Sequence, residues 1–142
     1  MLQVLVDADN VPSGRLQSLL DALVDALAGA DELSFTVAGH ADAVGALDWP
    51  SLATVIEAEG WQRADIVLAA AYLPVDGPLV IASGDGDFGL LATRHPGPVL
   101  VVSEAAAGRL RDVATVIDPV HDGAAAIRNW LTAVTPSDDA EE

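Results

Sequence analysis

The chain has 142 residues, of which 51% are apolar, so it is long enough for one domain with a hydrophobic core. Its 22 acidic residues outnumber six basic ones, all of them arginine, and the formal net charge is −16. The absence of lysine excludes a P-loop, a Schiff-base lysine and a lysine-dependent phosphatase, and the absence of cysteine excludes disulfides, thiolate metal sites and a cysteine nucleophile.

Apolar runs alternate with helical patterns along the chain, which predicts a three-layer α/β/α sandwich with a mainly parallel central sheet. The expected strands are Leu2–Val6, Leu33–Ala38, Ala53–Ile56, Leu79–Ala82, Pro98–Val102 and Thr115–Ile117. The expected helices are 12–28, Asp65–Leu73, Asp87–His95, Ala105–Asp112 and Asp122–Leu131. Residues 1–134 are expected to form a single domain, followed by a disordered acidic tail at 135–142.

No apolar stretch approaches the roughly 18–20 residues of a membrane span, and no basic signal-peptide segment precedes the first apolar run. We therefore expect no membrane association and a cytoplasmic location. The negative charge has two interpretations. It either provides solubility, or it belongs to a site whose potential is reversed by bound metal ions. It also repels nucleic acid at long range.

The first predicted strand ends in paired carboxylates. Asp7 and Asp9 follow Val6, and Asn10 adds an amide. If the chain stays extended, residues two apart point to the same side, so Asp7 and Asp9 are expected to share one. The plainer interpretation is a helix cap by Asp9 or Asn10. A cap needs only one such residue, however, and it does not use Asp7.

A second acidic turn, Ser83-Gly84-Asp85-Gly86-Asp87, follows the fourth predicted strand. Its glycines let the backbone approach a ligand closely, and the helix after it favours phosphate at its N-terminus. A simple cap by Ser83 or Asp85 is the alternative. Because ligands gather at the carboxyl ends of parallel strands, the two acidic turns are expected to meet in one crevice. Crowded carboxylates need a cation or a shared proton, and, where the partner is a cation, hard oxygen ligands select Mg²⁺ or Mn²⁺.

These two motifs resemble the NYN domain family, a branch of the PIN-like ribonucleases, and the resemblance runs from Leu2 to Pro119. The family also carries an aspartate at the start of its middle helix, which Asp65 matches, and residues 110–114 (LRDVA) resemble a late family segment. The chain departs from the family at 62–64 (QRA), where Lys-Gly is common, and at Ala71, where a further aspartate is frequent.

By this resemblance the chain is a ribonuclease that hydrolyses RNA phosphodiester bonds with Mg²⁺ or Mn²⁺. The residues implied to be catalytic and metal-binding are Asp7, Asp65, Asp85 and Asp87. Those implied to support them are Asp9, Asn10 and Ser83, and Arg63 is implied to contact RNA, although an arginine is by default a surface charge. The resemblance also implies a homodimer. His40 ends the second strand beside the predicted site, where a simple loop role is the more frequent one.

Two other functions stay open. A haloacid-dehalogenase-like phosphatase is suggested by Asp7-x-Asp9, but that family uses a lysine, which this chain lacks, and Pro12 follows closely. A catalytically silent PIN-like domain that binds a basic protein partner or a metal is suggested by the charge of −16 and by Ala71.

Overall fold

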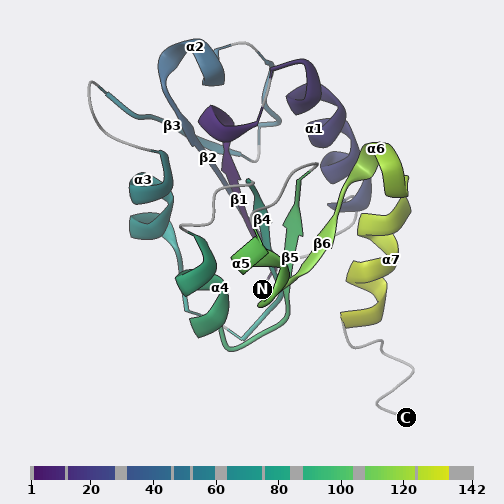
Figure 1. The fold of residues 1–142 in the computed structure, drawn as a ribbon. Coiled ribbons are helices and arrows are strands. Elements are labelled where there is room, and N and C mark those ends of the chain that lie inside the picture. Colours follow the sequence, from purple (N-terminus) through teal and green to yellow (C-terminus); the bar gives the residue numbers. More distant parts are fainter. Residues whose placement is uncertain are drawn as a thin grey trace.

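The protein is a six-stranded, wholly parallel sheet with helices on both faces, as the computed structural model shows (Figure 1). The structure describes residues 2–11, 13–27, 32–45, 47–51, 53–59, 64–74, 76–83, 88–103, 108–123 and 125–134. Within these ranges, the side chains at 10, 13–15, 65, 109 and 120 are not described. The predicted three-layer α/β/α fold is confirmed. Among the described helices, none combines the length and the apolar character needed to cross a membrane.

The strands follow the order β3-β2-β1-β4-β5-β6 across the sheet. Their bounds are β1 Leu2–Asp7, β2 Leu33–Gly39, β3 Thr54–Glu57, β4 Leu79–Ala82, β5 Val99–Val102 and β6 Thr115–Ile117. The chain builds outward from β1 through β2 and β3, then returns to the other side of β1 with β4. This reversal creates a topological switch point between β1 and β4, the place where doubly wound sheets bind their ligands.

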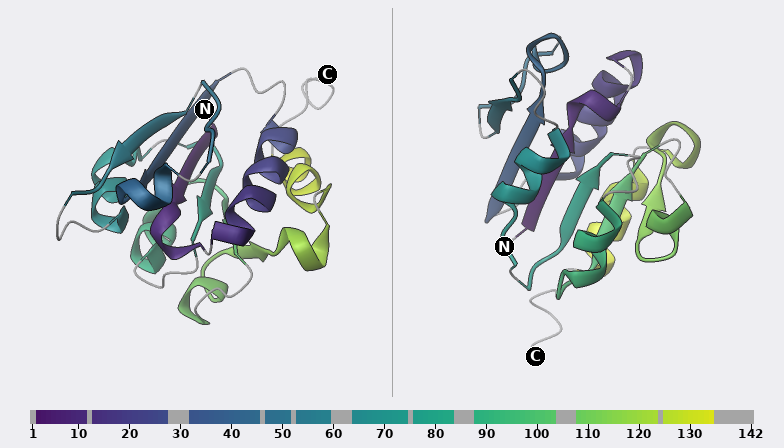
Figure 2. Two further views of the ribbon diagram at one scale, coloured as in Figure 1. Left: turned by 90° about the horizontal axis from the view of Figure 1, so that it is seen from above. Right: turned by 60° about the vertical axis from the view of Figure 1, so that its left-hand side comes forward.

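Successive residues of β1 face opposite helical layers, as a strand buried on both sides requires. Val4 and Val6 pack in one core with α1 (Ser13–Leu27) and α7 (Ala125–Val134). Leu5 packs in the other core with α3 (Ala64–Ala71), α4 (Gly89–Arg94) and α5 (Gly108–Arg111). Figure 2 shows these two layers on opposite sides of the sheet.

The predicted apolar face of α1 is confirmed except at one edge. Its leucines are buried against the sheet, namely Leu16, Leu19, Leu20, Leu23 and Leu27. Val24, which the pattern also places on this face, is 45% exposed. At 100° per residue, Val24 lies about 60° from Leu27 and about 100° from Leu23, at the margin of the stripe. A salt bridge between Arg128 and Asp25 joins α7 to α1 at the surface.

Three elements differ from the predictions. A short helix, α2 (Ala41–Val44), follows β2 where no helix was predicted. The closing helix predicted at Asp122–Leu131 is present as α7, but it begins at Ala125, and Asp122 belongs to a separate short helix, α6 (Pro119–Asp122). Gly123 lies between them with a φ of 88°, a left-handed conformation that ends a helix. The helix predicted to reach Leu73 ends as α3 at Ala71.

Candidate functional site

The carboxyl ends of β1 and β4 bring two predicted site residues together at the switch point. Val6 pairs with Ala82 in the parallel register, so Asp7 and Ser83 follow at equivalent positions. Both residues are wholly buried, and Ser83 Oγ donates a hydrogen bond to Asp7 Oδ2 at 2.9 Å. These partners are 76 positions apart in the sequence. The predicted meeting of the two strand ends is thus present in the fold.

Asp7 is a carboxylate removed from water, which is costly unless hydrogen bonds, a cation or a proton compensate its charge. The Ser83 hydroxyl supplies one hydrogen bond, and both residues take part in further interactions. A carboxylate oxygen beside a hydroxyl oxygen is a hard donor set of the kind that Mg²⁺ and Mn²⁺ prefer. The chemistry of this buried pair therefore fits a hard divalent cation.

Helix α3 begins at the same edge of the sheet (Figure 1). Its first residue, Ala64, is buried with Leu5 and Ala38 under the helical layer, and α3 packs against β1 and β2. Asp65 is the second residue of α3, so its backbone lies near the carboxyl ends of these strands. Alternation along β1 places Asp7 on the same face of the sheet as Leu5, which is the α3 face.

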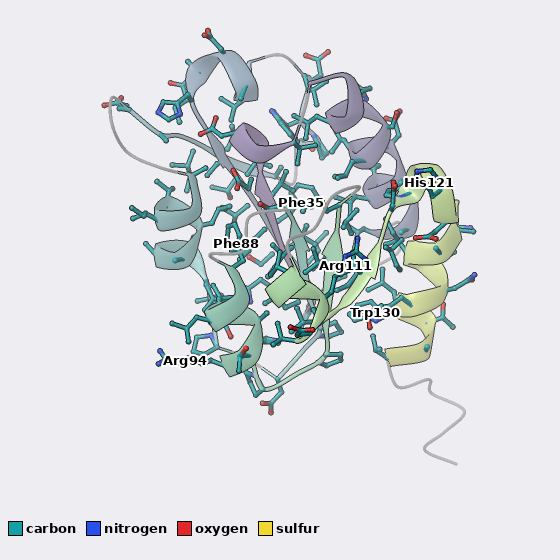
Figure 3. The ribbon with its side chains drawn as sticks, in the orientation of Figure 1. Phe35, Phe88, Arg94, Arg111, His121 and Trp130 are labelled. Atoms are coloured by element: carbon teal, nitrogen blue, oxygen red, sulfur yellow. The ribbon has the colours of Figure 1, made fainter. Side chains whose placement is uncertain are left out.

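The remaining predicted site residues fall outside the described part of the chain. This holds for Asp85, Asp87 and Arg63, and for the side chains of Asp65 and Asn10. The residues on either side of 84–87 are both buried: Ser83 is 0% exposed, and Phe88 is 2% exposed in the core of α3, α4 and α5 (Figure 3). Among the described side chains, no three His, Asp or Glu residues gather as a metal cluster.

Asp9 makes a different connection from Asp7. The condition under which Asp7 and Asp9 were expected to share a side, an extended chain, is not met, because residues Ala8–Asn10 form a 3-10 turn, η1. Asp9 Oδ1 accepts a hydrogen bond from the backbone N–H of His40 at 2.9 Å, and Oδ2 lies 2.8 Å from His40 Nδ1. Asp7 therefore contacts the end of β4 while Asp9 contacts the end of β2, on the opposite side of β1.

The contact between Asp9 and His40 depends on a close approach at Gly39. A Cβ atom at Gly39 would lie 2.9 Å from Ala8 Cβ and 3.1 Å from Asp9 Oδ1. The pairing was not predicted from the sequence. Asp7 pairs with Ala38 in the parallel register, so the chain leaves β1 and β2 side by side, and Asp9 reaches His40 from the 3-10 turn.

Comparison with known proteins supplies no family name. No protein-family model matches the chain, and no curated protein matches it. The fold and the site define its class as a doubly wound, wholly parallel α/β protein with a buried aspartate at the switch point of its sheet.

Proposed function

We propose that the protein is a cytoplasmic, Mg²⁺- or Mn²⁺-dependent ribonuclease of the NYN branch of PIN-like proteins. One observation carries the proposal: the wholly buried Asp7 is hydrogen-bonded to Ser83 at the switch point, where doubly wound sheets hold their ligands. The first turn carries carboxylates there, unlike the glycine-rich turn of dinucleotide-binding proteins. The resemblance of the two aspartate motifs adds RNA as the substrate.

The residues proposed to hold the metal are Asp7, Asp65, Asp85 and Asp87. When bound, the ion would orient the scissile phosphate and make an attacking water a stronger nucleophile. Ser83 fixes the Asp7 carboxylate by donating to Oδ2. Burial of both residues keeps the surroundings of Asp7 low in dielectric, where interactions between charges are strong. Asp9, whose two oxygens contact His40, supports the rim of this site.

The first test is cleavage of a pool of structured and single-stranded RNAs in Mn²⁺, Mg²⁺ or EDTA. Wild type, Asp7→Asn and Asp85→Asn are compared, since each substitution removes one charge and little volume. Asp76→Asn is the matched control, because Asp76 is exposed in the turn before β4, at the opposite edge of the sheet. We expect metal-dependent cleavage by wild type and Asp76→Asn, and background cleavage by the two site variants.

Calorimetric titration with Mn²⁺ provides a readout that does not depend on cleavage. We expect binding heat from wild type and a strong loss of it in Asp7→Asn. Folded wild-type protein that shows neither cleavage nor metal binding contradicts the proposal. Equal cleavage by all four proteins contradicts it as well, because the activity then belongs to a contaminant.

A second candidate function is supported by the rim of the carboxyl edge. Asp42 on α2, Glu57 at the end of β3 and Glu59 just after it are exposed there. These charges favour a catalytically silent domain that binds a basic protein partner. An arginine-rich peptide tests this function by calorimetry. The silent domain predicts binding that weakens in the double variant Glu57→Gln/Glu59→Gln and persists in Asp76→Asn, with no RNA cleavage by any of them.

A further inference from the structure

We propose that His40 is a phosphate-binding residue of the candidate site and that Asp9 is the residue that positions it. The inference rests on the proposed ribonuclease function and names the group that meets the RNA backbone. The first observation is the position of His40 in the fold. His40 directly follows β2, the strand that pairs with β1, so it lies at the same edge of the sheet as Asp7.

The pairing with Asp9 fixes the state of the imidazole ring. A carboxylate accepts hydrogen bonds and cannot donate them, so His40 Nδ1, 2.8 Å from Asp9 Oδ2, carries a hydrogen. Nε2 is then the nitrogen that gains or loses a proton, and when protonated it donates to an anion. The His40 side chain is 44% exposed and the Asp9 side chain 24%, so the ring is within reach of a ligand in solvent.

Local structure accounts for only part of this arrangement. His40 precedes α2, and its carbonyl oxygen accepts from the backbone N–H groups of Ala43 and Val44. The bond from the His40 backbone N–H to Asp9 Oδ1 holds the turn between β2 and α2 to the end of β1. Any residue other than proline at position 40 supplies these backbone contacts. The second bond, from the ring to Oδ2, is specific to histidine and sets the direction of the side chain.

The distribution of positive charge explains why such a residue is useful. RNA phosphates need cationic or donating partners, and the chain has no lysine. Among the described arginine side chains, Arg128 pairs with Asp25 on the α1–α7 face. Arg94 ends α4, at the edge of the sheet opposite to the carboxyl ends (Figure 3). The third, Arg111, is exposed at the end of α5. A histidine held by an aspartate places a donor at the end of β2, which Arg94 and Arg128 do not reach.

The experiment measures binding of a fluorescein-labelled, single-stranded hexanucleotide RNA by anisotropy in EDTA, so that cleavage plays no part. We expect His40→Gln to weaken binding about tenfold, the cost of one charge-assisted hydrogen bond. Asp9→Asn should weaken binding less, because the ring remains but loses its orientation. His121→Gln is the control, since the His121 side chain is 82% exposed on α6 and should bind as wild type does.

A second readout separates binding from structure. In the presence of Mn²⁺, His40→Gln should raise KM with little change in kcat, whereas Asp7→Asn should abolish kcat. Nitrogen NMR of the ring should show the His40 Nε2 resonance shifting as the RNA is added. Equal RNA affinity and KM for His40→Gln and wild type overturn the role of His40 and leave the ribonuclease intact.

Other outcomes divide the two proposals differently. Cleavage that survives in Asp7→Asn and Asp85→Asn overturns the metal-dependent ribonuclease, and the loss of oligonucleotide affinity in His40→Gln then still supports the phosphate site. If wild type cleaves RNA with metal but binds no oligonucleotide in EDTA, the phosphate role of His40 fails and the ribonuclease stands. Circular dichroism of each variant confirms that it is folded before any binding result is interpreted.

Discussion

Gln3 and Leu73 pair like two residues of neighbouring strands, although one partner is a side chain. Gln3 Nε2 donates to the Leu73 carbonyl oxygen at 2.9 Å, and the Leu73 backbone N–H donates to Gln3 Oε1 at 2.8 Å. Gln3 is a polar residue of the central strand and only 1% exposed, so this pairing satisfies an amide that water does not reach. It also ties the end of α3 to β1.

Replacing Gln3 with methionine should therefore destabilise the fold. Both main-chain groups of Leu73 lose their partner while the volume changes little, so we expect a loss of about 2 kcal/mol in the free energy of unfolding. Gln17→Met is the control, because Gln17 is exposed and bonds only to exposed Asp21 on the same helix. Urea denaturation measures both. Equal denaturation midpoints for Gln3→Met and Gln17→Met would show that the pairing of Gln3 with Leu73 contributes nothing to stability.

Gly39→Ala tests the close approach of β2 to the turn after β1. The new methyl group would lie 2.9 Å from Ala8 Cβ and 3.3 Å from Val44 Cγ1. We expect a loss of about 1–3 kcal/mol, typical of overpacking. Gly108→Ala makes the same change where a Cβ meets nothing within 4 Å, and should be neutral or slightly stabilising. A thermal melt of the two variants decides between strain at Gly39 and a general effect of alanine.

Gly123 should accept some residues better than others. With a φ of 88° it separates α6 from α7, and a Cβ there meets nothing within 4 Å, so only backbone strain opposes substitution. We expect Gly123→Ala to cost about 1–2 kcal/mol. Asparagine tolerates the left-handed region more readily, so Gly123→Asn should cost less. Chemical denaturation measures both variants. A lower free energy of unfolding for Gly123→Asn than for Gly123→Ala would contradict this account.

Tyr72 should make stability fall at alkaline pH. His95 Nε2 lies 2.7 Å from the Gly77 carbonyl oxygen, which only accepts, so in the neutral ring Nδ1 accepts from the Tyr72 hydroxyl at 2.7 Å. Burial raises the pKa of Tyr72 above its ordinary value of 10.0. The unfolded chain therefore loses the Tyr72 proton at a lower pH than the folded protein does. The stabilisation that protonated Tyr72 contributes is complete below pH 10 and is lost as the pH rises through the pKa of the folded protein.

The chain has one tyrosine, so absorbance at about 295 nm reports Tyr72 alone. We expect its titration midpoint in the folded protein to lie above that in urea. Tyr72→Phe should remove this part of the alkaline loss of stability. Coincident midpoints in the folded and unfolded protein would contradict the expectation.

The outer face of α3 carries apolar side chains in solvent. Ile66 is 58% exposed on α3, and the exposed Ala69 and Ala70 follow it three and four residues on, on the same side of the helix. Leu73, two residues past the end of α3, is 44% exposed. Because Ile66 is already in water, Ile66→Asn should change the free energy of unfolding by less than about 0.5 kcal/mol. Light scattering of the same variant tests the expected homodimer. A dimer formed through this face should become a monomer.

The sheet could be predicted from the sequence because its signal is local. The apolar runs of β4 and β5 are continuous and that of β1 is interrupted by Gln3 alone, as expected for strands covered on both faces, and the structure places all three inside the sheet. The meeting of Asp7 with Ser83 could also be anticipated, because strand ends converge at one edge of any parallel sheet. Both predictions depend only on strand order and direction.

The features that were missed depend on geometry beyond the pattern. The helix predicted from Asp122 runs through Gly123, where a positive φ separates α6 from α7. Asp9 contacts His40 from the 3-10 turn after β1, and the strand pattern does not predict that turn. Burial of Gln3 opposite Leu73 depends on where α3 ends, which a helical pattern fixes to within a few residues at best.

The hydrogen bond between Asp7 and Ser83 crosses the seam between the two halves of the sheet, β1–β3 on one side and β4–β6 on the other. Neither half contains both partners, so the buried pair forms only when the halves dock. A chain divided between α3 and β4 would therefore yield two fragments that regain the site together and lack it apart. If the two fragments were fused to two other proteins, recovery of the site would report that those proteins had bound each other.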